Sequence, residues 1–505
     1  MSNDLNKSKE SPRIALKFAN IIFILGILFS VLIIIYGIYK IYNIPEGKYI
    51  NRASITPMFY LIGIIFGLIS TTLFSFGLRL NNNLKINLSI TVVAVVFAVY
   101  ALETYLDIKS RGPFGSQSGN TLEEMRVIKA KQMGIEFDTR TRLEVFQDLF
   151  KEGIDAYPAV HTRYVLKKTN GKGLNINDGN LVPLGGISNK VTLIDNENGF
   201  WVKYKSDKFG FHNPENVYQN NEIDIVIIGD SFVEGKAVKS NENISGVLRE
   251  LGFSVVNIGK VGNGPLLEFA SLIEYAEPLK PKIVLWAYYE SDLVELFFEM
   301  KYPLLKNYLN NDEFSQNLRS RQDEVDKAMI NFMQKEWKTK MYQKVNPYKS
   351  QIFEKTEKNW IAKIFHALLL RNLRSTIKVE PRLSRLHEQE LTIFKNILQK
   401  SRDRVSGWDG KLYFVYLPRF PCYNKLGTNC RNTFNKEEMY RKDVLQIIEK
   451  LNIPNIDTLN EVFKPHSDPT SLFPFRMYGH YNAKGYRLIA EAISNRLVLD
   501  GIKPF

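Results

Sequence analysis

From residue 223 onward, short apolar segments alternate with segments of helical spacing, and this alternation limits the possible folds more than any other feature. The apolar segments are continuous, as is typical of strands buried on both faces of a parallel sheet. We expect strands at residues 223–228, 254–258, 283–288, 412–417 and 455–457. We expect helices at residues 243–251, 266–275, 436–451 and 486–499. The pattern predicts an α/β fold with a doubly wound parallel sheet.

Three apolar runs lie upstream, at residues 18–39, 56–78 and 86–102, and each is of a length that suits a membrane-spanning helix. The first is too long for the apolar core of a signal peptide, so we interpret it as an anchor. The predicted organisation is therefore a three-helix membrane anchor at 1–108 and a linker with an N-terminal extension at 109–222. A catalytic domain follows at 223–505, interrupted by a basic, helical insertion at about 293–401.

The basic residues that flank these runs predict their orientation, because cytoplasmic loops are enriched in Lys and Arg. An N-terminus inside the cell places six basic side chains on the cytoplasmic side: Lys7, Lys9, Arg13, Lys17, Arg79 and Lys85. Three spans then place everything after about residue 109 outside the cytoplasm, in the periplasm or the extracellular space.

The chain has two cysteines, Cys422 and Cys430, and both lie in one polar, loop-like segment. We predict a local disulfide, which suits an oxidising compartment outside the cytoplasm. The alternative is a pair of free surface thiols. Two thiols without a neighbouring histidine do not complete a tetrahedral zinc site, and we predict no metal.

Two segments at opposite ends of the α/β region carry candidate chemistry. The first strand runs into Gly229, Asp230 and Ser231, and His480 lies just before the closing helix. A serine hydroxyl becomes a nucleophile when a base removes its proton, and a histidine is the natural base. Either segment alone reads as an ordinary turn or helix start. Together they predict a Ser231–His480 pair at the carboxyl ends of the strands.

Further residues at the strand ends suit an oxyanion site, where hydrogen-bond donors stabilise developing negative charge. Gly259, Gly262 and Asn263 follow the second strand, and a glycine there lets a backbone N–H approach the oxyanion closely. Ser291 follows the third strand.

This set of segments resembles the SGNH hydrolase (GDSL esterase) family from about residue 224 to the C-terminus. The resemblance implies a flavodoxin-like sheet with Ser231 as nucleophile and His480 as base. Gly262 best fits the family's oxyanion glycine, and Gly259 is the second choice. Two positions depart from the family pattern. Ser291 stands where the family has an oxyanion asparagine, so Asn263 is a substitute candidate, and Met477 stands where the family has the aspartate that orients the histidine.

Three replacements for that aspartate remain open. Asp468 is the first choice, Asp457 is the second, and a backbone carbonyl is the third. A turn-forming role for Asp468, which precedes a proline, is the competing interpretation.

The resemblance implies a membrane-anchored serine esterase or O-acyltransferase outside the cytoplasm, acting on an ester such as an acylated cell-envelope glycan and needing no cofactor. The alternative is a non-catalytic binding or assembly subunit of an envelope acyl-transfer system, in which the spans dock a membrane partner. The formal net charge is +14, which suits an anionic partner. No nucleic-acid-binding motif accompanies that charge, so we predict no nucleic-acid partner.

Overall fold

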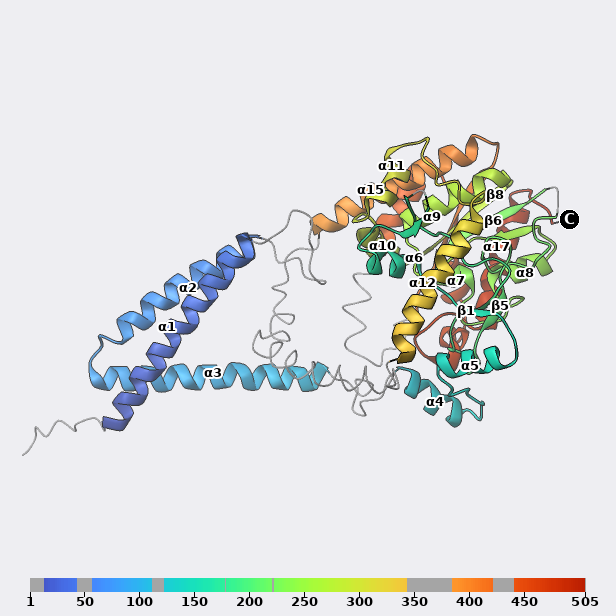
Figure 1. Ribbon diagram of the computed structural model, residues 1–505. Coiled ribbons are helices and arrows are strands. Elements are labelled where there is room, and N and C mark those ends of the chain that lie inside the picture. Colours follow the sequence, from blue (N-terminus) through green and yellow to red (C-terminus); the bar gives the residue numbers. More distant parts are fainter. Residues whose placement is uncertain are drawn as a thin grey trace, which may run out of the picture. The chain divides into compact units, whose positions relative to one another are not determined.

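The computed structural model describes residues 13–42, 57–110, 122–177, 179–219, 222–342, 384–420 and 440–504 (Figure 1). The chain divides into two compact units. Among the described residues, the first unit contains the three N-terminal helices and residues 384–386, and the second contains the described residues of 122–342 and 387–504. The Cys422–Cys430 segment and the centre of the basic insertion lie outside the described residues.

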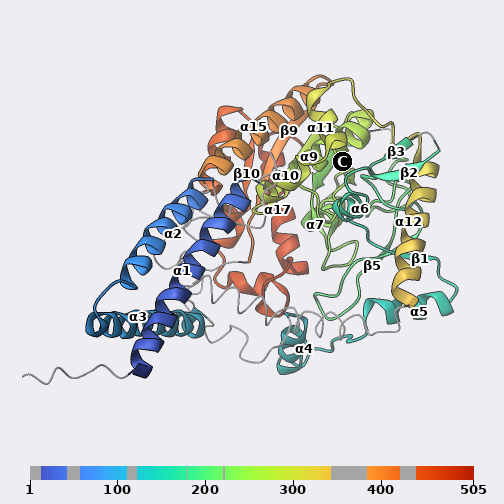
Figure 2. The ribbon, with the colours of Figure 1, turned by 60° about the vertical axis from the view of Figure 1, so that its left-hand side comes forward.

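The first unit consists of α1 (Arg13–Tyr42), α2 (Pro57–Gly77) and α3 (Asn82–Ser110). All three are long and apolar enough to cross a membrane. Helices α1 and α2 lie side by side (Figure 2) and approach closely at glycines. A Cβ placed on Gly37 would lie 2.7 Å from Ile64, and one on Gly67 would lie 2.7 Å from Ile34. Helix α3 continues past Glu103, where we expected the third apolar run to end.

The second unit is built on a five-stranded sheet in which every pair of neighbours is parallel. The strands are β6 (Ile225–Gly229), β7 (Val255–Asn257), β8 (Ile283–Tyr289), β9 (Lys411–Leu417) and β10 (Asn455–Asp457). Their spatial order is β10-β9-β8-β6-β7. In chain order this is 2-1-3-4-5, the arrangement of flavodoxin-like sheets. The predicted parallel α/β sheet is confirmed, and coverage of both its faces by helices stays a prediction.

The strands read as continuous apolar runs because they are buried on both sides. Every residue of β6, β7 and β8 is buried, and in β9 only Lys411 is exposed. The register pairs Gly229 at the end of β6 with Ala287 in β8. This pairing brings the carboxyl ends of the neighbouring strands β6 and β8 to the same edge.

Helices connect the strands, and polar caps set where several of them begin. The Asn243 side chain accepts a hydrogen bond from the Gly246 N–H at 2.8 Å, which fixes the start of α8. Helix α9 begins with a proline and continues into a π-helical turn at Leu272–Ala276 and a 3₁₀ turn at Glu277–Leu279. The helices in this part are α7 (Ser231–Glu234), α8 (Ile244–Glu250), α9 (Pro265–Ser271), a helix at 440–450 and α17 (Ala483–Leu499).

The described parts of the insertion are helical, as the sequence predicted: α10 (Asp292–Glu299), α11 (Pro303–Asn310), α12 (Gln322–Tyr342) and α15 (Ser384–Ser406). Helix α12 lies against the N-terminal extension (Figures 1 and 2). Its Asp326 accepts a hydrogen bond from the Ser188 N–H at 2.9 Å, and Gln322 donates to the Gly186 carbonyl at 3.1 Å.

The N-terminal extension contains short helices and strands. They are α4 (Leu122–Gln132), α5 (Arg142–Lys151), α6 (Thr162–Lys168), β1 (Ala156–Pro158), β2 (Leu174–Ile176), β3 (Gly179–Leu181), β4 (Val191–Leu193) and β5 (Lys203–Lys205). Buried side chains of the extension, such as Leu166, Leu184 and Phe211, belong to the same hydrophobic cluster as the central sheet. The extension is therefore continuous with the core rather than a separate layer.

Candidate active site

Ser231 lies just beyond the carboxyl end of the interior strand β6, as the first residue of α7. Asp230 caps this single helical turn, because its Oδ1 accepts a hydrogen bond from the Phe232 N–H at 2.8 Å. Gly235 ends the turn in the left-handed conformation. The order of strands reverses between β6 and β8, and ligands of open α/β sheets bind beyond the strand ends at such a point.

His480 reaches Ser231 from the other end of the chain. Its Nε2 lies 2.7 Å from the Ser231 Oγ. Asn482 holds the end of the His480 loop at the start of α17, where its side chain accepts a hydrogen bond from the Gly485 N–H. The Phe232 ring packs on the imidazole with centroids 4.4 Å apart. The expected serine–histidine contact is therefore present, with a geometry that lets the imidazole accept the hydroxyl proton.

The acidic residue that orients the histidine is Glu197, in the N-terminal extension. Its Oε1 lies 3.0 Å from the His480 Nδ1, and its Oε2 accepts a hydrogen bond from the His480 backbone N–H at 2.9 Å. A carboxylate at Nδ1 keeps the proton on that nitrogen, which leaves Nε2 free to accept from serine. The two residues are 283 positions apart in the sequence.

The Glu197 carboxylate is buried among positive charges. Lys236 lies 3.7 Å from its Oε1, and Arg126 lies 3.4 Å from its Oε2. Burial alone would raise the pKa of Glu197, but the His480 ring, Lys236 and Arg126 outweigh burial and hold the pKa below its ordinary value. The residue is therefore an anion at neutral pH, as an orienting acid must be.

The structure corrects the sequence prediction for this acid. The Asp468 carboxylate accepts a hydrogen bond from the Thr470 hydroxyl at 2.9 Å and pairs with Arg476. It therefore stabilises the 3₁₀ turn at Pro469–Leu472, which it precedes. The second choice, Asp457, pairs with Arg441. The proposed backbone carbonyl is not needed either, because the carboxylate of Glu197 takes the position beside Nδ1.

Sequence reasoning missed Glu197 because its surroundings look like a loop. It stands in the run Asp195, Asn196, Glu197, Asn198 and Gly199, whose residue types are those of turns. No motif spacing connects that run to His480. To identify Glu197 from the sequence, one would have to know which residues of the extension pack on the His480 loop.

The oxyanion candidates come from the two strands that flank β6. Gly262 and Asn263 follow β7, and Ser291 follows β8 at the start of α10. The Lys260 N–H donates to the Gly229 carbonyl at 3.1 Å, which ties the Gly262 loop to the end of β6. This arrangement places the candidates on both sides of the serine-bearing strand.

Gly262 adopts a φ of +78°, a conformation that favours glycine. Within the described part of the chain, neither its backbone N–H nor that of Ser231 donates a hydrogen bond to another backbone group. The Asn263 amide is buried, and neither of its polar atoms has a hydrogen-bond partner among the described residues. Ser291 begins α10 without a side-chain capping bond. Free donors are what an oxyanion site requires.

A buried ion pair links the serine turn to the Gly262 loop. Glu234, the last residue of α7, lies 2.8 Å from the Lys260 Nζ, and its other oxygen accepts a hydrogen bond from the Val261 N–H at 2.7 Å. Tyr204 donates to Glu234 at 2.9 Å. Burial favours the neutral acid, but Lys260 and these donors outweigh it and lower the pKa of Glu234. The network fixes the position of Gly262 relative to Ser231.

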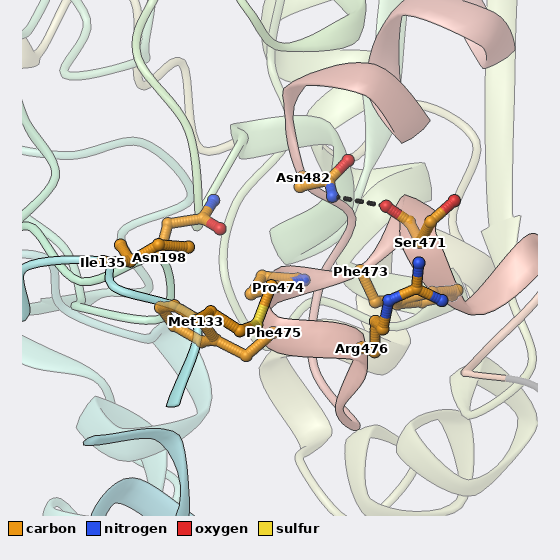
Figure 3. A pocket seen from close by; sticks show the side chains of 9 residues that line it. All are labelled: Met133, Ile135, Asn198, Ser471, Phe473, Pro474, Phe475, Arg476 and Asn482. Carbon is orange, nitrogen blue, oxygen red and sulfur yellow. Dashed lines mark hydrogen bonds between the residues drawn. The ribbon is translucent and has the colours of Figure 1, made fainter. Parts of the chain in front are cut away.

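A cavity of about 280 Å³ lies next to the His480 loop (Figure 3). One residue of its wall, Asn198, follows Glu197 in sequence. Two others are hydrogen-bonded to each other, because the Asn482 side chain donates to the Ser471 carbonyl at 2.8 Å (Figure 3). The wall includes Phe475 and Arg476, whose φ values of +52° and +57° are unusual for residues with side chains. The lining residues are Met133, Ile135, Asn198, Ser471, Phe473, Pro474, Phe475, Arg476 and Asn482. The cavity lies where the extension meets the His480 loop.

No protein-family model matches the chain, and no curated protein matches it. Solved structures do match. One is a putative lipolytic protein of the G-D-S-L family from Desulfitobacterium hafniense DCB-2, with 13% identity over 55% of this chain and 99% of that one, at a TM-score of 0.30. Another is LAE5, an alpha/beta hydrolase from the metagenome of Lake Arreo, with 13% identity over 55% of this chain and 95% of that one, also at 0.30.

A third match is a catalytic mutant of Axe2, an acetylxylan esterase from Geobacillus stearothermophilus, with 13% identity over 55% of this chain and 94% of that one, at a TM-score of 0.29. Similarity at this level carries no weight for individual residues. The roles of Ser231, His480 and Glu197 rest on the distances between them.

Proposed function

We propose that this protein is a membrane-anchored serine esterase or O-acyltransferase whose catalytic unit lies outside the cytoplasm. The observation that carries the proposal is the hydrogen-bonded chain from Ser231 through His480 to Glu197. A nucleophile, a base and an orienting acid in this order are the parts of a serine acyl-transfer site.

In the first half-reaction, the Ser231 Oγ attacks the carbonyl carbon of the ester, and its proton passes to the His480 Nε2. The carbonyl oxygen becomes an anion, held by the backbone N–H groups of Ser231 and Gly262. The bond from the carbon to the alcohol oxygen then breaks, and the alcohol takes the proton from Nε2. Glu197 keeps the charged imidazole in place throughout and does not itself accept a proton.

In the second half-reaction, an acceptor hydroxyl gives its proton to Nε2 and attacks the acyl-enzyme. The acyl group leaves Ser231, which recovers the proton. Water as acceptor makes the reaction a hydrolysis, and a sugar hydroxyl makes it an acyl transfer. An acylated glycan of the cell envelope suits an enzyme held at the membrane, and that substrate class rests on the family resemblance of the sequence.

The second candidate function is a non-catalytic binding or assembly subunit on the same fold. Two departures from the family pattern support it. Ser291 stands where the family has an oxyanion asparagine, and Met477 stands where the family has the aspartate that orients the histidine. The Ser231–His480 contact of 2.7 Å and the carboxylate of Glu197 favour the enzyme, because a binding protein has no need of an oriented imidazole.

The test is covalent labelling of the full chain in detergent with a fluorophosphonate probe, together with hydrolysis of p-nitrophenyl acetate. We expect the wild type to be labelled and active, and Ser231→Ala and His480→Ala to lose both properties. Asp468→Asn is the matched control and keeps both. A folded wild type that is neither labelled nor active overturns the proposal.

A further inference from the structure

His161 in the N-terminal extension lies directly beside the candidate oxyanion glycine. It is the residue before α6. A Cβ placed on Gly262 would lie 2.7 Å from the His161 Nδ1, closer than real side chains approach. The imidazole therefore forms the wall against which the Gly262 backbone packs. The extension thus meets the core on the oxyanion side as well as on the Glu197 side.

Among the described residues, the His161 ring has no hydrogen-bond partner that explains its position. As the N-cap of α6 it makes no side-chain capping bond. His212, by contrast, is a structural histidine: its Nδ1 lies 2.7 Å from the Glu234 carbonyl oxygen, and its Nε2 lies 2.7 Å from the Ser240 hydroxyl. His161 is partly exposed as a residue, whereas His212 is buried.

The charge state of His161 suits a donor. Burial is the main reason that the pKa of His161 falls to about 4; Glu234 opposes this shift, and Lys236, Arg142 and Arg163 add to it. The imidazole is therefore neutral at neutral pH, with one N–H to donate. A neutral donor does not compete with Ser231 for the proton on its way to His480.

We propose that His161 is a catalytic residue that donates a hydrogen bond to the acyl oxygen of the substrate as that oxygen becomes an anion beside Gly262. The inference rests on the proposed function and names a third donor for it. Asn263 also has an amide without a hydrogen-bond partner among the described residues, but it is buried at 1% exposure, so the partly exposed His161 is better placed to meet an entering ester.

The hydrogen bond from His161 transfers no proton. The N–H proton stays on the imidazole, and the serine proton still travels to the His480 Nε2. Because the hydrogen bond strengthens only as the carbonyl oxygen gains charge, its loss lowers kcat and leaves KM nearly unchanged. Loss of one such donor typically lowers kcat by about 10²–10³-fold.

The experiment compares three substitutions in the full chain in detergent, using p-nitrophenyl acetate hydrolysis and the rate of fluorophosphonate labelling. His161→Ala removes the ring, His161→Phe keeps its bulk without a donor, and His161→Gln supplies an N–H donor. We expect kcat to fall by about 10²-fold in the Ala and Phe variants and to recover in part in the Gln variant. His466→Phe is the matched control, because the His466 Nδ1 accepts a hydrogen bond from the Asp468 N–H and so belongs to the Asp468 turn.

Thermal unfolding of each variant separates a folding defect from a catalytic one. Full activity in folded His161→Phe overturns the proposal and leaves His161 a packing residue, and equal activity in all variants overturns it too. A wild type and His466→Phe that are folded but inactive overturn the proposed function itself, which is a distinct result.

Discussion

At the scale of single residues, the site depends on which carboxylate reaches the His480 ring. Glu197 makes two hydrogen bonds to His480, one to the ring and one to the backbone, so it sets both the tautomer and the position of the loop. Asp468 lies closer in sequence but is committed to Thr470 and Arg476. Proximity along the chain was therefore a poor guide to the acid.

The role of Glu197 is tested by Glu197→Gln. The amide keeps the size of the side chain but lacks the negative charge that holds the proton on the His480 Nδ1. The histidine is then left in the tautomer that carries its proton on Nε2, which does not accept the serine proton. We expect kcat for p-nitrophenyl acetate to fall by about 10²–10⁴-fold, as for other triad acids. Asp468→Asn keeps wild-type kcat. Equal losses in the two variants would contradict the assignment of Glu197.

At the scale of elements, four buried carboxyl groups gather where β6, β8, α9 and α10 meet: Asp230, Glu268, Asp292 and Glu299. Glu299 accepts hydrogen bonds from the Gly264 N–H at 2.6 Å and the Leu266 N–H at 2.9 Å, and so caps α9. Neither Glu268 oxygen has a hydrogen-bond partner among the described residues. Four carboxyl groups so close in an apolar environment do not all ionise.

This cluster makes the stability of the fold depend on pH. Burial, together with the charges of Asp230 and Glu299, raises the pKa of Glu268 well above its ordinary value, and burial raises the pKa of Glu299 to about 7. A folded-state pKa above the unfolded value gives stability that is present below the unfolded pKa, about 4.3, and is lost as pH rises toward the folded pKa.

The prediction concerns Glu268→Gln, which is neutral at every pH. We expect its melting temperature, relative to wild type, to be higher at pH 8 than at pH 5, by on the order of a few degrees. Differential scanning fluorimetry at the two pH values measures this difference. Exposed Glu449→Gln is the control and shows no such change. A difference that is the same at both pH values would rule out ionisation of Glu268 as the cause.

At the scale of the whole molecule, three apolar helices precede a single α/β unit to which the extension belongs. The extension supplies Glu197 to the site and places His161 beside Gly262. It is therefore part of the candidate active site, and a unit that began at residue 223 would lack the carboxylate that contacts His480.

The membrane orientation is tested by single cysteines in a chain whose Cys422 and Cys430 are replaced by serine. Phe150→Cys lies on an exposed side chain of the second unit, and Arg79→Cys lies in the turn between α2 and α3. The basic flanks predict that the second unit is outside and the turn inside. We expect a membrane-impermeant maleimide to label Phe150→Cys, but not Arg79→Cys, in intact cells. The reverse pattern would invert the topology.

The sequence alone determined the local elements, because strand and helix signals are carried by neighbouring residues. The predicted strand 455–457 matches β10, and the predicted strand 283–288 ends one residue before β8 does. The sequence also indicated Ser231 and His480, because each stands at the end of a strand or helix beside characteristic turn residues. The helix expected at 266–275 instead ends at Ser271 and continues as a π-helical turn.

Only the tertiary structure decided which acid meets His480 and which side chain lines the Gly262 loop. Glu197 and His480 are 283 residues apart, and their contact depends on the packing of the extension against the core. Hydrophobic periodicity and turn chemistry describe what a segment forms, not which distant segment it touches. A loop residue such as Glu197 acquires its role when packing buries it among His480, Lys236 and Arg126, where the positive charges keep it ionised.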